Sequence, residues 1–214
     1  MANPIGIYIH IPFCKSKCDY CDFYSLAGRE EEMDRYQRAL LTHLRSFAPQ
    51  LKGRVVDTIY FGGGTPSYYG EKRLREILAL LQRLCTVSRQ AEITVECNPD
   101  SVDGRSMARL RRAGVNRISL GAQSADQDQL RCVHRVHSPK QVTQAVADIR
   151  KAKIDNLSLD LIYGLPDQTL ASWEDTLHKA VALGPEHISC YGLKVEEGTP
   201  LARQAALGLE LPDE

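Results

Sequence analysis

Short apolar runs alternate with segments of helical periodicity along the whole chain of 214 residues. Each run has five to seven residues rich in Ile, Val, Leu and Tyr, as buried strands do. The expected strands are residues 5–11, 55–61, 92–97, 117–121, 157–162 and 188–193. This alternation predicts about six successive β-α units and constrains the fold more than any other feature of the sequence.

Between the expected strands, apolar residues recur every three or four positions, as on the buried face of a helix. Ser138 followed by Pro139 predicts the start of one helix, and Gly184 followed by Pro185 predicts the end of the next. Strands joined by helices lie parallel with right-handed crossovers. The fold class is therefore α/β, either an open doubly wound sheet or a barrel, and six units are too few for an eight-stranded closed barrel.

Composition and charge exclude several classes of protein. The 27 basic and 27 acidic residues balance to zero, which argues against a nucleic-acid partner held by bulk positive charge. Hydrophobic residues make up 43% of the chain and charged residues 25%, which are ordinary values for a globular protein. No apolar run approaches the ~20 residues that span a bilayer, and the N-terminus lacks a targeting signal. We expect a cytoplasmic protein without a membrane span.

Cysteine is the unusual residue type, with seven in the chain. Cys14, Cys18 and Cys21 lie within eight residues, directly after the first expected strand. Clustered cysteines in a reducing compartment indicate a metal centre before a disulfide. Thiolates hold iron–sulfur clusters, and three ligands on a four-iron cluster would leave one iron open. Structural zinc is the alternative, and it would need a fourth ligand such as His10.

Polar residues and glycines follow the other expected strands. In parallel β-α folds the active site lies at the carboxyl ends of the strands, so we expect these residues to converge. Three glycines, residues 62–64, would let a ligand approach the backbone, with N–H and C=O groups free to bond it. The polar residues that follow the strands are Thr65, Glu96, Asn98, Gln123, Arg135 and Asp160.

Two further cysteines and two histidines also need an interpretation. Cys97 and Cys190 fall within expected strands, and we predict that both are small buried apolar side chains. His134 and His137 flank Arg135. We interpret this stretch as a solvated loop.

Taken together, these residues resemble the radical S-adenosylmethionine (SAM) superfamily. The match rests on Cys-x3-Cys-x2-Cys at residues 14–21 and Gly-Gly-Thr-Pro at residues 63–66. The closer resemblance is to the oxygen-independent coproporphyrinogen III oxidase family, and it covers nearly the whole chain. It is carried by the stretches at residues 8–14, 61–66, 96–99, 121–124 and 160–166. The resemblance implies a partial (β/α)6 barrel formed by one radical SAM core domain over residues 1–214.

Two branches of that family differ in the cysteine motif. The true oxidases have a fourth cysteine two residues after the third, where this chain has Phe23. This form resembles HemW, the heme-chaperone branch, and the chain also begins almost directly at its first expected strand. The resemblance thus implies a protein that binds heme and delivers it to acceptor hemoproteins. The alternatives are oxidative decarboxylation of coproporphyrinogen III and a zinc-stabilised protein without redox function.

The resemblance also implies a role for each matching residue. Cys14, Cys18 and Cys21 would bind a 4Fe–4S cluster, and SAM would chelate its fourth iron. The implied SAM contacts are Tyr8, Tyr20, Gly63, Gly64, Thr65, Glu96, Gln123, Arg135 and Asp160. Heme would be cargo, and an axial heme ligand is the alternative role for His134 and His137. The partners would be acceptor hemoproteins, some of them in membranes, and an electron donor. Members of the family carry a further C-terminal domain, so we expect this chain to bind the cluster and SAM without completing heme transfer.

Overall fold

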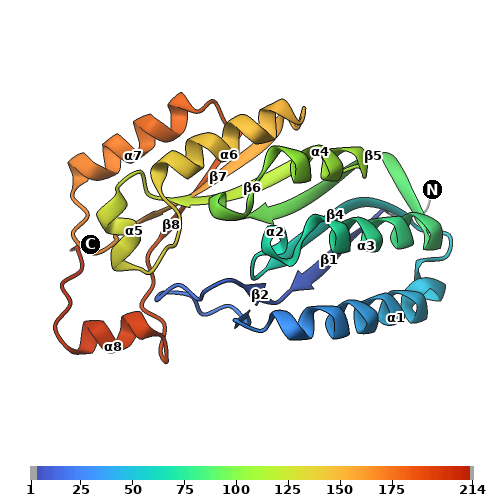
Figure 1. The fold of residues 1–214 in the computed structure, drawn as a ribbon, viewed down its shortest axis with the longest axis horizontal. Helices are drawn as coiled ribbons and strands as arrows, with labels where there is room; N and C mark the ends of the chain where they lie inside the picture. The colour runs from blue at the N-terminus through green and yellow to red at the C-terminus, as the bar shows by residue number, and fades with distance from the viewer. Residues whose placement is uncertain (1–3, 213–214) are drawn as a thin grey trace.

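The computed structural model describes residues 4–212, and its centre is one six-stranded parallel sheet (Figure 1). The strands follow one another across the sheet in chain order, and every neighbouring pair is parallel. They are β1 (Ile5–Ile11), β4 (Val55–Gly63), β5 (Thr86–Cys97), β6 (Arg117–Gln123), β7 (Asn156–Tyr163) and β8 (His187–Gly192). The predicted α/β class is confirmed, and each of the six expected strands has a counterpart in this sheet.

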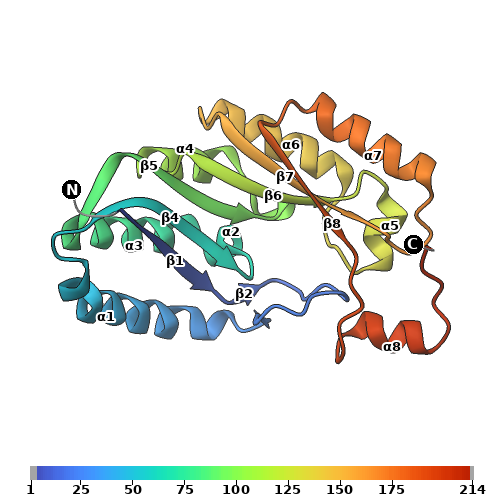
Figure 2. The same cartoon turned by 180° about the vertical axis from the view of Figure 1, so that it is seen from behind.

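The longer helices between the strands lie on one face of the sheet. They are in front of the strands in Figure 1 and behind them in Figure 2. The helices are α1 (Met33–Leu51), α2 (Pro66–Tyr69), α3 (Glu71–Leu84), α4 (Gly104–Arg112), α5 (Gln127–Cys132), α6 (Pro139–Lys151), α7 (Leu170–Ala182) and α8 (Pro200–Ala206). Two short 3-10 turns, η1 (Glu30–Glu32) and η2 (Pro99–Ser101), precede α1 and α4. A doubly wound sheet would carry helices on both faces, so this arrangement is the predicted partial (β/α)6 barrel.

The two faces of the sheet differ in polarity because strand side chains alternate between them. On the face toward the helices, the register aligns one apolar row across five strands. That row consists of Ile9, Phe61, Val95, Ile118 and Leu157, and all five are buried. The helices contribute their own apolar side chains to the same core, among them Leu74, Ile77, Leu81, Met107 and Ile149. The opposite face is left for polar side chains and for the site.

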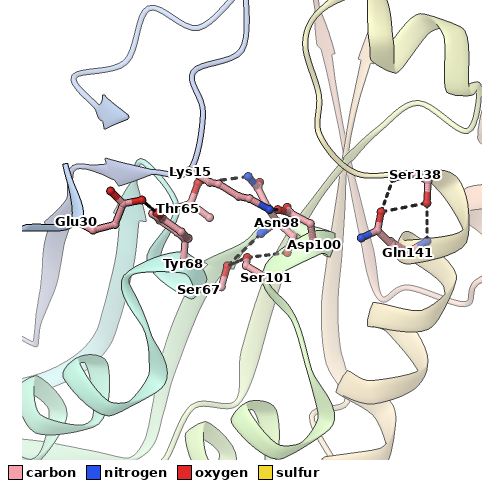
Figure 3. Close-up of polar contacts among 10 residues, drawn as sticks. All are labelled: Lys15, Glu30, Thr65, Ser67, Tyr68, Asn98, Asp100, Ser101, Ser138 and Gln141. Atoms are coloured by element: carbon pink, nitrogen blue, oxygen red, sulfur yellow. Dashed lines mark hydrogen bonds and ion pairs between the residues drawn. The ribbon is translucent and has the colours of Figure 1, made fainter. Parts of the chain in front are cut away.

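The helix boundaries follow the predicted signals. Ser138 caps α6 in a capping box with Gln141, which Figure 3 shows, and Pro139 occupies the first turn. Gly184 adopts a φ of +64° just after the end of α7, a conformation that glycine takes without strain. No helix in the described residues 4–212 is long and apolar enough to cross a membrane.

One burial prediction is wrong. Cys97 is buried in β5 as expected, and burial raises the pKa of its thiol to about 12. Cys190 is exposed, because β8 is the last strand of the sheet and has a neighbour on one side only. An apolar-looking run does not show whether its strand lies at the centre or the edge of a sheet.

Candidate functional site

The cysteine loop, residues 14–25, leaves the sheet at the carboxyl end of β1. Its two ends are held together by a short parallel ladder between β2 (Phe13–Cys14) and β3 (Leu26–Ala27). The N–H of Leu26 also donates to the carbonyl of Pro12 at 2.6 Å. All three cysteines of the loop are free and half-buried. The sequence between the two ladder strands has no regular structure, so its shape depends on contacts with other parts of the chain.

The glycine loop, residues 62–65, lies beside it at the end of β4. The N–H of Gly63 donates to Glu96 Oε2 at 3.0 Å, and the N–H groups of Gly64 and Thr65 donate to backbone carbonyls at 2.8 Å. Those carbonyls belong to Ile11 and Phe13. The expectation that the N–H groups are free for a ligand is therefore wrong, because they hold the loop to β1 and β5. A ligand would meet the carbonyl side of this loop.

Two residues from other loops contact the cysteine thiols, and a third residue connects these two. Thr65 Oγ1 donates to Cys14 Sγ at 3.4 Å, and Arg135 Nη1 donates to Cys18 Sγ at 3.5 Å. Asn98 connects the two donors: its Nδ2 donates to Thr65 Oγ1 at 3.3 Å, and its Oδ1 accepts from Arg135 Nη2 at 3.1 Å (Figure 3 shows the Thr65–Asn98 pair). The predicted convergence of the glycine loop, Asn98 and Arg135 on the cysteine loop is confirmed in the structure.

The three thiols are not gathered around one point. Within residues 4–212, no three His, Cys, Asp or Glu side chains lie close enough together to hold a single metal ion. His10 is bonded elsewhere, with its ring nitrogens at 3.1 Å from the Tyr8 hydroxyl and 2.9 Å from the carbonyl of Tyr24. A four-iron cluster attaches each thiolate to a different iron, so it fits cysteines that are spread along a loop better than one zinc ion does.

Glu96 and two tyrosines form a group on the polar face of β1, β4 and β5. Tyr60 donates its hydroxyl to Glu96 Oε1 at 2.8 Å. Burial raises the pKa of Glu96 despite this bond and the one from Gly63. Tyr8 is 59% exposed, and its ring stacks on that of Tyr60 with centroids 6.0 Å apart. Tyr60 was missed by the sequence analysis, although its position two residues before Gly62 places it on the same face of β4.

Asp160 and Gln123 lie further along the same rim. Ser119 donates to Asp160 Oδ2 at 2.7 Å, which fixes this carboxylate at the end of β7. Gln123 has a φ of +64° at an irregularity in the pairing of β6 with β7, and such bulges redirect side chains. A Cβ at Gly121 would come within 2.8 Å of Gln123 Nε2 and 3.0 Å of Arg135 Nη2, so glycine is needed there for these side chains to converge.

Tyr20 lies between the last two cysteines of the loop. Its side chain packs in a small apolar cluster with Val133, Ile162 and Leu165, at the mouth of the barrel. Burial raises its pKa far above the ordinary tyrosine value. The phenol is therefore neutral and can serve as a flat apolar surface.

The two histidines near Arg135 have different environments. His134 is exposed and bonds through Nδ1 to Asp19, a buried residue of the cysteine loop. His137 is 1% exposed and bonds to the carbonyl of Ala122 at 3.0 Å, so the interpretation of this whole stretch as a solvated loop is wrong. Burial lowers the pKa of His137 to about 4.

A small cavity opens between the cysteine loop, α2 and η2. Cys18, Thr65, Asn98 and Arg135 line it, together with Asp100, whose carboxylate pairs with Lys15 at 3.5 Å (Figure 3). At its edge Tyr68 donates to Glu30, and the hydroxyls of Ser67 and Ser101 lie 2.5 Å apart. Arg135 Nε is buried in the described structure without a hydrogen-bond partner. An unpaired guanidinium N–H beside a cavity fits an anionic group such as a carboxylate.

The chain belongs to the radical SAM superfamily, whose family model matches residues 8–180. The solved coproporphyrinogen III oxidase (HemN) of Escherichia coli superposes with a TM-score of 0.91 and 29% identity, over 99% of this chain and 49% of the oxidase chain. Membership of this superfamily implies a 4Fe–4S cluster and SAM.

The curated relatives confirm the predicted resemblance to the HemW branch. The heme chaperone HemW of Mycobacterium tuberculosis (strain CDC 1551 / Oshkosh) is 37% identical over 100% of this chain and 56% of its own length. HemW of Escherichia coli (strain K12) is 39% identical over 92% of this chain and 52% of its own length. The chain thus spans about half the length of the curated relatives it matches.

Proposed function

We propose that this chain is the cluster- and SAM-binding core of a heme chaperone of the HemW type. The observation that carries the proposal is the placement of the cysteine loop. Its thiols lie at the carboxyl ends of the strands, where Thr65 and Arg135 donate to Cys14 and Cys18. Hydrogen bonds to cluster sulfurs are among the ways in which a protein tunes iron–sulfur centres.

The proposed cluster ligands lie in the cysteine loop, and the proposed contacts to the methionine end of SAM lie mainly in the glycine loop. Cys14, Cys18 and Cys21 hold the cluster, which supplies the electron for reductive cleavage of the SAM sulfonium. Gly63, Gly64 and Thr65 contact the methionine end of SAM through the carbonyl side of the glycine loop. The Nε–H of Arg135 is available to the carboxylate of SAM.

The remaining contacts surround the rest of SAM. Tyr20 packs beside the adenine, because its phenol is neutral and lies in an apolar cluster at the barrel mouth. Tyr8 assists at the methionine end. Glu96, Gln123 and Asp160 line the polar rim, where their carboxylates and amide can accept or donate hydrogen bonds. Together these residues orient SAM and exclude water.

The first experiment tests the cluster and SAM. The chain is reconstituted anaerobically with iron and sulfide, reduced, and examined by EPR with and without SAM. We expect a 4Fe–4S signal that SAM changes, and we expect it to be absent from a variant with Ser at positions 14, 18 and 21. Cys190→Ser is the matched control, because Cys190 is exposed on β8 away from the loop. One zinc per chain and no cluster would overturn the proposal.

Heme as cargo is supported by the names of the relatives and by residue 23. Phe23 is 70% exposed in the cysteine loop, where the oxidases have a fourth cysteine. We propose heme and acceptor hemoproteins as partners, an electron donor for the cluster, and peripheral contact where the acceptor is in a membrane. Free cysteines persist in a reducing compartment, which supports the cytoplasm as the proposed location.

The oxidase activity is the second candidate, and the superposition on the coproporphyrinogen III oxidase of E. coli favours it. The two functions differ in their products. The loaded protein is incubated anaerobically with SAM, a chemical reductant for the cluster, and either hemin or coproporphyrinogen III. Heme retained on a denaturing gel, without decarboxylated product, supports the chaperone. Formation of 5′-deoxyadenosine and protoporphyrinogen would overturn it in favour of the oxidase.

A further inference from the structure

Asp19, the residue after Cys18, is charged and yet only 5% exposed. Its Oδ2 atom lies 2.6 Å from His134 Nδ1 and accepts a hydrogen bond from Gln204 Nε2 at 3.0 Å. These two partners are 115 and 185 residues away along the chain. None of the three residues is among the proposed cofactor contacts, so the network is not explained by cluster or SAM binding.

The backbone of Asp19 reaches the same two segments. Its N–H donates to the carbonyl of Val133 at 3.2 Å, and its carbonyl accepts from the N–H of Leu201 at 3.0 Å. The peptide groups and the carboxylate are therefore all paired with distant residues. Buried carboxylates are stable only when they are paired in this way.

One of the two segments is α8, which is separated from the sheet. Figures 1 and 2 both show it beyond the end of the strands, on the side where the cysteine loop lies. Leu201, at the start of α8, is fully buried. Together with the two bonds to Asp19, this packing fastens α8 to the cysteine loop.

The other segment lies between α5 and α6 and is joined to the cysteine loop at two adjacent positions. Asp19 bonds to His134 while the adjacent residues, Cys18 and Arg135, are joined by the Arg135 Nη1–Sγ bond. His134 has a φ of +53°, which is costly for a residue with a side chain. The bond to Asp19 holds His134 in this conformation, and the conformation directs the next residue, Arg135, at the thiol of Cys18.

We propose that Asp19 is a positioning residue for the cluster site. It fastens the cysteine loop to α8 and to the segment after α5, and it sets the contact between Arg135 and Cys18. The role of Cys18 as a cluster ligand rests on the proposed function. The fastening of the cysteine loop by Asp19 does not depend on whether a cluster is bound.

The first test therefore uses the protein without cluster. The rates at which iodoacetamide alkylates Cys18 and Cys21 are measured by mass spectrometry under reducing conditions, with exposed Cys190 as the internal reference. Replacing Asp19 with Ala removes a buried charge-assisted network, so we expect alkylation of both cysteines to rise ~10-fold by local opening. Gln204→Leu removes only the donor on α8, and we expect a smaller rise of about threefold.

Arg203→Ala is the matched control, because Arg203 is exposed on the same helix and, within the described residues 4–212, its side chain bonds only to the carbonyl of Gly198. It should leave the alkylation rates unchanged. If Asp19→Ala does not fold, Gln204→Leu decides the question, since it alters one side chain at the surface of α8. Alkylation of Cys18 and Cys21 in Gln204→Leu at the rate of Arg203→Ala would overturn the proposal.

A second measurement separates positioning from general stability. In the loaded protein, Asp19→Ala should change the reduction potential and the SAM-induced EPR change, because the side-chain acceptor for His134 is lost and Arg135 would no longer be held against Cys18. Arg203→Ala should change neither. An unaltered potential and EPR response in Asp19→Ala would contradict the positioning role. If the wild-type chain assembles no cluster, the proposed function fails, and the alkylation experiment still decides whether Asp19 fastens the loop.

Discussion

The cysteine loop and the glycine loop lie side by side at one rim of the sheet, and they are held in different ways. The N–H groups of Gly63, Gly64 and Thr65 are paired with groups on adjacent strands or just beyond them. The cysteine loop is held through Asp19, whose partners come from the segment after α5 and from α8. The glycine loop is fixed by its neighbours in the sheet, whereas the middle of the cysteine loop, at Asp19, is fixed by remote parts of the chain.

This difference has a consequence for folding and loading. The glycine loop takes its shape once β1, β4 and β5 have paired. The cysteine loop takes its shape only when the part of the chain after α5 is also folded, since His134, Leu201 and Gln204 all contact it there. We therefore expect substitutions in the glycine loop to act on global stability and changes around the cysteine loop to act locally.

The largest expected effect is that of Gly64→Ala. A Cβ at residue 64 would lie 2.8 Å from the carbonyl oxygen of Phe13 and 2.9 Å from that of Ile11. These are backbone atoms at the end of β1 and just after it, and they cannot move away as a side chain could. We expect a loss of about 4 kcal/mol in the free energy of unfolding, measured by urea denaturation.

Gly28→Ala is the matched control for this substitution. Gly28 has a φ of +63° but open space around a Cβ, so alanine there causes backbone strain without a clash. We expect a loss of about 1 kcal/mol. Equal losses for the two variants would contradict the view that the glycine loop is fixed by close contact with β1.

The second-largest expected effect is a loss of stability at low pH, caused by a histidine in the segment that anchors the cysteine loop. Burial lowers the pKa of His137 to about 4, and the nearby charge of Arg135 acts in the same direction. In the unfolded chain, this histidine binds a proton near pH 6.5. The contribution of the neutral, buried ring to the free energy of unfolding is therefore complete above pH 6.5 and is lost as the pH falls toward 4. The unfolding free energy should decrease by about 3 kcal/mol across this window.

Comparison of two variants isolates this residue. His137→Gln should flatten the dependence of the unfolding free energy on pH between 4 and 6.5. His43→Gln, at an exposed position on α1, should retain it. The same slope in both variants would show that His137 does not cause the acid sensitivity.

The features that were predictable from the sequence depend on local patterns. Short apolar runs, with helical spacing between them, predicted all six strands of the sheet, and glycine and proline marked helix ends such as that at Gly184. Residues that directly follow a strand could be placed at the rim, because parallel strands end at the same edge. For this reason Thr65 and Arg135 were expected near the cysteines, and the structure brings them to Cys14 and Cys18.

The features that were missed depend on contacts between distant segments. Asp19 looks like an ordinary solvated residue of a polar loop, and only the fold shows that Gln204 approaches it. His137 is buried because its segment turns back under β6, which no local pattern indicates. Cys190 is exposed because β8 has no second neighbour. Burial at these positions is a property of the assembled chain.

The smallest expected effect tests whether the polar face beside the glycine loop contacts SAM. The Tyr8 hydroxyl lies 3.1 Å from His10 Nδ1, and a Cβ at Gly63 would lie 2.5 Å from that same histidine ring. Because the hydroxyl is at an exposed position, Tyr8→Phe should cost no more than about 0.5 kcal/mol of stability.

If Tyr8 contacts SAM, loss of its hydroxyl should weaken SAM binding to the loaded protein about fivefold, or about 1 kcal/mol. Tyr24→Phe, an exposed tyrosine of the cysteine loop, is the control and should bind SAM as the wild type does. Both affinities can be read from EPR titrations, and unchanged binding in Tyr8→Phe would remove Tyr8 from the SAM site while leaving its stacking on Tyr60 as its role.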